Sequence, residues 1–113
     1  GVVAYGNDTK IKQLGVPKLI LSEHGAVSES IAAAMASGVR SKAGTELGIG
    51  VTGIAGPSGG TQEKPVGTVV FAVETSDQQE IRTMRFYGGR ELVNYQASQF
   101  ALDMVRRILE DRD

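Results

Sequence analysis

The sequence has no cysteine, a single histidine and few aromatic residues. Without cysteine, the chain has no disulfide, no thiolate metal site and no cysteine nucleophile. A catalytic triad or a histidine metal site would depend on His24 alone, and we favour the simpler interpretation of a polar residue at a helix end. Since aromatic residues make up only 5% of the chain, a surface that stacks nucleic-acid bases is disfavoured.

Neither sign of charge is in excess, and no hydrophobic run is long enough to span a membrane. Twelve lysines and arginines face 13 aspartates and glutamates, which gives a net charge of −1. This balance does not indicate a nucleic-acid or anionic-membrane partner. We therefore expect a cytoplasmic protein. Its 113 residues, 41% of them hydrophobic, suffice for one domain with a core.

The hydrophobic pattern predicts a mixture of strands and helices. Strands are expected over residues 1–5, 47–54, 68–74 and 81–87. Short helices are expected over 9–14 and 18–23, a third helix from an N-cap at Ser28 to a stop at Gly44, and a long one over 90–109. The nearly continuous apolar run over 47–54 favours a central strand covered on both faces. The expected fold over residues 1–113 is a single three-layer α/β domain, with helices on both faces of a mixed sheet.

A long glycine-rich loop joins the two middle strands, between Thr52 and Gly67. Glycines allow backbone N–H groups to come close to a ligand, because no side chain intervenes. The hydroxyls of Thr52, Ser58 and Thr61 and the cation of Lys64 suit an anion, with phosphate as the first candidate. A long solvated connection is the alternative, and composition alone leaves the two equally open.

Gly48, Gly50 and Gly53 form a literal G-x-G-x-x-G, which is the pattern of a dinucleotide-binding turn. In that turn the glycines follow a strand and open a helix. Here they lie inside the expected strand, and Gly56-Pro57 follows in place of a helix. We therefore reject a dinucleotide site.

Three further side chains are candidates for chemistry. Tyr5 ends the first expected strand and Lys10 follows in the next helix, which places both at the strand edge where ligands of α/β sheets bind. Spacing alone favours an ordinary packed tyrosine and an exposed lysine. Arg90 opens the last helix, where a cation meets the positive end of the helix dipole. That mismatch indicates a partner such as phosphate, or Arg90 simply begins the helix.

Three stretches of the sequence stand out as a possible family signature. They are Thr52-Gly53-Ile54-Ala55-Gly56-Pro57 continuing through Gly59-Gly60-Thr61 and Glu63–Val69, Gly1–Tyr5 with Asn7, Lys10-Ile11 and Leu14-Gly15-Val16, and His24–Glu29. These stretches resemble the CinA C-terminal domain family, which includes the nicotinamide mononucleotide deamidases. The central signature is long and therefore specific, and the resemblance extends over essentially the whole chain.

The resemblance implies an amidase that converts nicotinamide mononucleotide and water to nicotinic acid mononucleotide and ammonia. The family uses a serine nucleophile with tyrosine and lysine helpers, which Tyr5 and Lys10 match, and needs no cofactor or metal. Backbone N–H groups of the loop would stabilise the oxyanion and hold the phosphate. The substrate-binding residues so implied are Thr52, Gly53, Ile54, Ala55, Gly56, Gly59, Gly60, Thr61, Lys64 and Arg90.

Two departures from the family pattern qualify this expectation. The nucleophile segment, which resembles Glu-Ser-Cys-Thr-Gly-Gly, is not found, so we expect an N-terminally incomplete domain that is inactive as this fragment. Asn94 stands where the family usually has an arginine, and it is a poor substitute in binding phosphate. The alternative function is a non-catalytic nucleotide-binding or assembly module of a competence/damage-inducible CinA-like protein. An apolar strand at the start of the chain would leave core exposed, so we expect either a homo-oligomer or lost residues to cover it.

Overall fold

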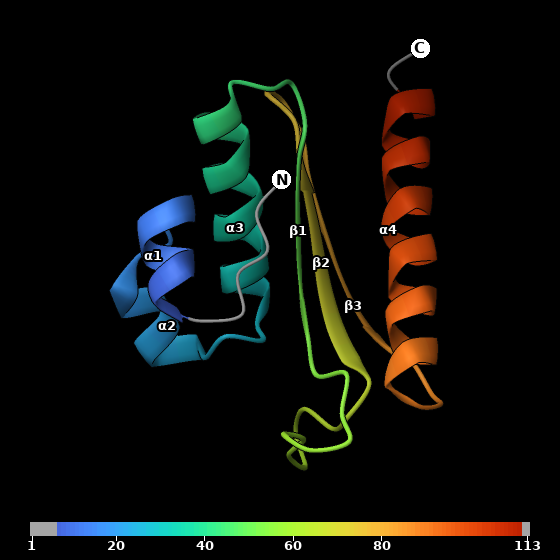
Figure 1. The fold of residues 1–113 in the computed structure, drawn as a ribbon. Helices are drawn as coiled ribbons and strands as arrows, with labels where there is room; N and C mark the ends of the chain where they lie inside the picture. The colour runs from blue at the N-terminus through green and yellow to red at the C-terminus, as the bar shows by residue number, and fades with distance from the viewer. Residues whose placement is uncertain (1–6, 112–113) are drawn as a thin grey trace. The chain divides into compact units, whose positions relative to one another are not determined.

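The computed structural model describes residues 7–111, which form four helices and a three-stranded antiparallel sheet (Figure 1). The strand order is β1-β2-β3. The α/β class and the long C-terminal helix are confirmed, whereas the strand expected over residues 1–5 lies outside the described residues. The elements are α1 (Asn7–Leu14), α2 (Lys18–His24), α3 (Glu29–Ala43), β1 (Gly48–Gly53), β2 (Thr68–Glu74), β3 (Gln79–Arg85) and α4 (Arg90–Asp111).

The described chain divides into two compact units, and every strand has residues in both. The helical unit contains the residues up to Thr52 together with Val70–Arg82. The loop unit contains Gly53–Val69 together with the residues from Thr83 onward. The glycine-rich loop and the helix that begins at Arg90 therefore belong to the same unit.

The third helix begins and ends where the sequence predicts. Ser28 is its N-cap, and the Ser28 hydroxyl accepts a hydrogen bond of 3.2 Å from the backbone N–H of Ile31. Gly44 ends the helix in the left-handed conformation, with a φ of +64° that glycine adopts without steric cost. Both α1 and α2 pack against this helix, as Figure 1 shows.

Two faces of α3 build the core of the helical unit. One face carries Ile31 and Met35, which pack with residues of the α1–α2 region, and the other carries Ala32 and Ala36. The alanine face meets Val70 and Ala72 of β2. Small side chains on this face allow the helix to lie close to the strands.

The first strand lies at the edge of the described sheet, so the expectation of a central strand covered on both faces is wrong for these residues. Its residues alternate between buried and exposed, with Ile49 and Val51 exposed. Gly48 and Gly50 face α3, where a β-carbon would collide with the carbonyl oxygens of Ala36 and Ala32. These two glycines serve close helix–strand packing. The strand buried on both faces is β2, over residues 68–73.

The hairpin between β2 and β3 starts its second strand two residues earlier than expected. Thr75 makes a tight turn, because its backbone N–H donates to the Gln78 carbonyl at 2.8 Å and its hydroxyl accepts from the Gln78 N–H at 3.0 Å. The hydroxyl also donates to the Asp77 carboxylate at 2.9 Å. This closed turn leaves Gln79 free to begin β3.

The last helix buries one stripe of side chains at helical spacing, as predicted. The buried residues are four, seven and four positions apart, which keeps them on one face of an α-helix. Beside this stripe, Phe100 meets Phe86 edge to face, with ring centroids 6.1 Å apart. The stripe consists of Val93, Ala97, Met104 and Ile108.

Candidate functional site

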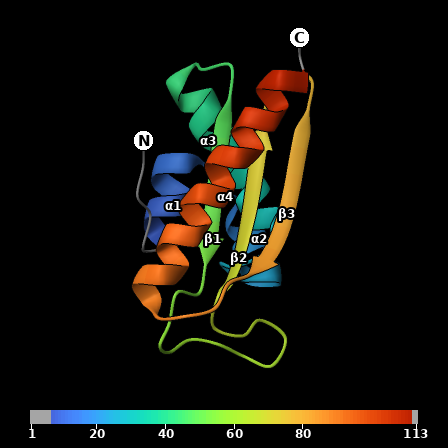
Figure 2. The same cartoon turned by 90° about the vertical axis from the view of Figure 1, so that its right-hand side faces the viewer.

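The glycine-rich loop is fixed at its base by backbone hydrogen bonds. Ile54 donates its N–H to the Thr68 carbonyl at 2.9 Å, and Gly67 donates to the Ile54 carbonyl at 2.7 Å. Phe86 in turn donates to the Gly67 carbonyl at 2.8 Å. Both ends of the loop are therefore attached to the strand framework. In Figure 2 the loop extends beyond the ends of β1 and β2.

The tip of the loop is a small closed turn. The N–H of Thr61 donates to the Lys64 carbonyl at 2.9 Å, and the Thr61 hydroxyl accepts from the Lys64 N–H at 3.0 Å. A β-carbon on Gly60 would come within 2.6 Å of the Val66 nitrogen, so the outgoing chain folds back tightly against this glycine. The predicted residues Gly59, Gly60, Thr61 and Lys64 thus share one compact segment.

Arg90 contacts the middle of the loop. Its Nη1 donates a hydrogen bond of 2.9 Å to the carbonyl oxygen of Gly56. Gly56 has a φ of +86°, and its peptide bond to Pro57 is cis. The structure thus brings together two of the predicted residues, Gly56 and Arg90, which lie 34 positions apart in the sequence. The guanidinium of Arg90 is therefore directed at the loop backbone.

Lys10 is the only charged residue that is buried in the part of the chain described by the structure. It lies in α1, its side chain is 5% exposed, and its carbonyl accepts a hydrogen bond of 3.1 Å from the Val16 N–H at the end of the helix. Sequence spacing favoured an exposed lysine, and that expectation is wrong. Burying an ammonium group is costly unless the surroundings compensate, so this position is unusual for a lysine.

The hydroxyl of Thr52 already serves the fold of the helical unit. Thr52 is 8% exposed and donates a hydrogen bond of 2.8 Å to the Ala26 carbonyl, between α2 and α3. A hydroxyl carries one hydrogen and two lone pairs, so Thr52 retains only its acceptor capacity for a ligand. Ala26 lies in the His24–Glu29 stretch that resembles the family, and this bond gives that stretch a structural role.

The predicted residues fall into two groups. Lys10 and Thr52 belong to the helical unit, and Gly53, Ile54, Ala55 and the other loop residues belong to the loop unit with Arg90. Tyr5 lies outside the described residues.

Sequence reasoning missed Val66, which packs on both Gly56 and Gly60. Its signal was an apolar residue at the end of a loop that is otherwise poor in apolar side chains.

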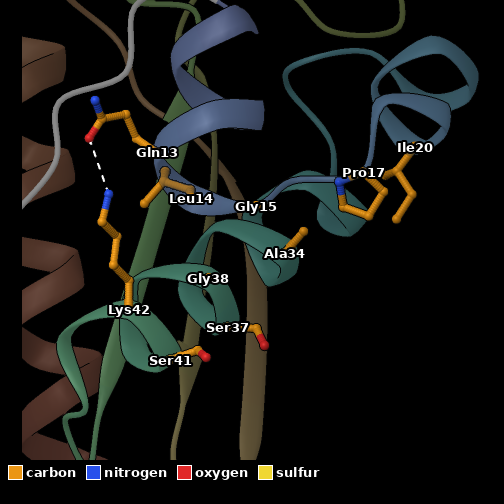
Figure 3. A pocket seen from close by; sticks show the side chains of 10 residues that line it. All are labelled: Gln13, Leu14, Gly15, Pro17, Ile20, Ala34, Ser37, Gly38, Ser41 and Lys42. Carbon is orange, nitrogen blue, oxygen red and sulfur yellow. Dashed lines mark hydrogen bonds between the residues drawn. The ribbon is translucent and has the colours of Figure 1, made fainter.

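A cavity of about 530 Å³ lies in the helical unit, between α3 and the turn that joins α1 to α2 (Figure 3). None of the predicted site residues lines it. Lys42 closes one side by a 3.4 Å hydrogen bond to the Gln13 side chain, and the small residues of α3 form its floor. The lining consists of Gln13, Leu14, Gly15, Pro17, Ile20, Ala34, Ser37, Gly38, Ser41 and Lys42.

The described residues contain no cluster of three or more His, Asp or Glu side chains that could hold a metal ion. No helix among them is long and apolar enough to cross a membrane.

One carboxyl has a clearly shifted pKa: a hydrogen bond from Arg106 lowers the pKa of Asp103 below its ordinary value. Arg106 is exposed and Asp103 is half-buried, and both lie on α4 well along the helix from Arg90.

Comparison with known proteins gives a consistent result. The model of the CinA C-terminal domain family matches residues 1–109. A CinA-like protein of Gemmatimonas aurantiaca is 53% identical over 95% of this chain, and one of Kosmotoga olearia is 48% identical over 96%. The chain spans about a quarter of the length of these curated relatives, 25% and 26% respectively.

Solved structures show the same fold. The competence damage-inducible protein A (ComA) of Klebsiella pneumoniae is 38% identical with a TM-score of 0.92, over 97% of this chain and 68% of that one. The competence/damage inducible protein CihA of Agrobacterium tumefaciens is 39% identical with a TM-score of 0.89, over 93% of this chain and 65% of that one.

Proposed function

Because this chain belongs to the CinA C-terminal domain family, we propose that it is part of an amidohydrolase acting on nicotinamide mononucleotide. The reaction consumes water and gives nicotinic acid mononucleotide and ammonia. The substrate carries a carboxamide and a phosphate. Among the predicted residues, Lys10 offers a base for reaction at the carboxamide, and the glycine-rich loop with Lys64 offers N–H groups and a cation for the phosphate. No cofactor is required for hydrolysis of this bond.

The observation that carries the proposal is the burial of Lys10. A serine hydroxyl needs a base before it can attack an amide, and a lysine in a partly dry pocket can serve when no histidine does. Among the described residues, Lys10 alone combines a basic group with this degree of burial. Its position matches the lysine helper that the family resemblance implies.

The proposed chemistry proceeds in two steps. A serine oxygen attacks the carboxamide carbon, its proton passes to the Lys10 amine, and that proton then leaves on the departing ammonia. Water next hydrolyses the acyl-enzyme ester, which regenerates the serine and releases the carboxylate. Tyr5 is the second proposed helper in these proton transfers. None of the serines in this chain matches the family's nucleophile motif, so the reaction is tested on the full-length protein.

The glycine-rich loop is proposed to bind and polarise the substrate. Backbone N–H groups near Gly53 to Gly56 would stabilise the oxyanion that forms during attack, a contribution that is commonly large in amide hydrolysis. The turn from Gly59 to Lys64 would hold the phosphate through the lysine ammonium and through those of its N–H groups that do not close the turn itself. Thr52 contributes as a hydrogen-bond acceptor, since its hydrogen is donated to Ala26.

The first test measures ammonia release from nicotinamide mononucleotide by the full-length protein. We expect release that depends on enzyme concentration, with nicotinic acid mononucleotide as the matching product. A folded protein that carries the upstream serine but releases no ammonia would contradict the proposal.

The second test replaces Lys10 with methionine, which keeps the apolar stem of the side chain and removes the amine. We expect turnover to fall at least about a hundredfold, the usual contribution of a general base, with little change in binding. Lys12→Met is the matched control, because Lys12 lies in the same helix and is exposed. Equal rates in the two variants would remove Lys10 from the mechanism.

Asn94 favours a second candidate function, a module that binds a nucleotide without hydrolysing it. Asn94 is exposed on α4, one turn after Arg90, and its carboxamide cannot replace the two-pronged hydrogen bond of an arginine to phosphate. Calorimetry that shows binding of a pyridine nucleotide, together with no turnover by the full-length protein, would support this candidate. Turnover would exclude it.

A further inference from the structure

The middle of the glycine-rich loop is tied to the fold through Arg90. The base is fixed by the bonds of Ile54 and Gly67, and the tip is closed by the turn from Thr61 to Lys64. Between them, residues 55–59 include two glycines with positive φ, and glycine backbone is unusually free to rotate. Arg90 reaches this middle segment from the start of α4 and bonds to its backbone.

The hydrogen bond from Arg90 restrains the backbone of the loop at Gly56. Its acceptor is the Gly56 carbonyl, which belongs to the peptide unit between Gly56 and Pro57. A peptide unit is planar, so fixing its oxygen restricts the rotation of the residues on both sides. Val66 also lies close to Gly56, since a β-carbon on this glycine would meet the Val66 methyl group at 2.5 Å. Gly56 is therefore contacted by both Arg90 and Val66.

The location of Arg90 also explains why a cation opens α4. A positive charge at the N-terminus of a helix is opposed by the helix dipole. A carbonyl oxygen at 2.9 Å offsets that cost, because a hydrogen bond from a charged donor is stronger than a neutral one. The arginine is therefore held at this position by the loop, just as the loop is held by the arginine.

We propose that Arg90 is a positioning residue, which holds the glycine-rich loop in its substrate-accepting conformation through the Gly56 carbonyl. This inference rests on the proposed function for its effect on catalysis, but its effect on the loop is independent of any activity. A residue that only bound phosphate would act once substrate is present. A positioning residue acts on the loop of the ligand-free protein.

The test compares methyl NMR spectra of the ligand-free full-length protein. In Arg90→Met the aliphatic stem is kept and all donors are lost, so we expect the Ile54 and Ala55 methyl signals to shift and to show increased motion. The methyl signal of Ala72, which is buried in β2, should stay in place. Arg107→Met is the matched control, since Arg107 is an exposed arginine on the same helix that pairs with Asp103.

Arg90→Lys keeps one charged donor and should restore much of the parental spectrum. In the deamidase assay, we expect Arg90→Met to lower kcat about tenfold, the effect of one hydrogen bond to a charged donor, with a smaller change in KM. Loop signals that are unchanged in Arg90→Met would overturn the positioning role, and a rise in KM alone would then identify Arg90 as a simple phosphate ligand. If the full-length protein lacks deamidase activity, the loop signals still decide this inference.

Discussion

Gly38 of the helical unit and Gly59 of the loop unit show two distinct purposes of glycine in this protein. Gly38 does not have a positive φ and is needed because a neighbouring backbone leaves no room for a β-carbon. Gly59 has a positive φ and only an ordinary contact nearby, so it is needed for its conformation. Neither purpose is confined to one unit, since Gly44 of the helical unit has a positive φ and Gly60 of the loop unit is crowded. The comparison teaches that space and backbone conformation are separate requirements, so the same substitution should have different consequences.

The largest effect is expected for Gly38→Ala in α3. A β-carbon there would collide with the Leu14 carbonyl oxygen at the end of α1, and backbone cannot move aside as a flexible side chain does. Alanine normally stabilises a helix interior by about 1 kcal/mol relative to glycine, but overpacking should reverse the sign. We expect a loss of about 3 kcal/mol in the free energy of unfolding, measured by urea denaturation. A stabilised variant would refute the packing role.

Gly67→Ala should cost about as much, and it sharpens the comparison because Gly67 combines both purposes. Its φ is +96°, and a β-carbon would collide with the Phe86 carbonyl oxygen. We expect a loss of about 3 kcal/mol from overpacking and backbone strain together, accompanied by movement of the loop base. Thermal unfolding measures the first effect, and methyl NMR of Ile54 measures the second. An unchanged melting temperature would show that the backbone around Gly67 and Phe86 can shift at little cost in free energy.

Gly59→Ala isolates the conformational purpose. Its φ is +95°, yet a β-carbon would meet only the Ile54 side chain, at an ordinary distance of 3.6 Å. We expect a modest loss of about 1 kcal/mol in stability and a clear weakening of nucleotide binding, because the strain falls on the binding segment. Calorimetric titration with nicotinamide mononucleotide provides the measurement. Unchanged affinity for nicotinamide mononucleotide would show that its phosphate does not bind at this segment.

Gly89→Ala is expected to have the smallest effect. Gly89 does not have a positive φ, a β-carbon there would meet no atom of the described residues within 4 Å, and the residue directly precedes α4. The free energy of unfolding should change by less than about 0.5 kcal/mol. A large loss in the free energy of unfolding would show that Gly89 is needed for a reason other than lack of space or a positive φ.

Periodicity and end signals predicted most of the described fold. The helical spacing of α3 and α4, the cap at Ser28 and the stop at Gly44 are local features, and the structure confirms them. Among the described residues β1 is an edge strand with Ile49 and Val51 exposed, which its apolar run did not predict, because such a run does not tell which strands lie on either side. The start of β3 was missed because it depends on one side chain, Thr75, closing the turn.

The candidate site was predictable as a set of residues but not as an arrangement. Composition identified the loop, and the family resemblance identified Lys10. The spacing of residues alone did not indicate that Lys10 is buried. The bond between Arg90 and Gly56 joins residues far apart in sequence through a backbone oxygen, which carries no sequence signal. The commitment of the Thr52 hydroxyl to Ala26 was hidden for the same reason.

The closed base of the glycine-rich loop has a consequence for how such a protein can diversify. Since Ile54 and Gly67 bond to each other, the segment between them begins and ends at nearly one point of the framework. A segment of this kind can change in length and composition at small entropic cost to the rest of the chain. The loop can therefore vary in length while the strands that carry it keep their pairing at the base.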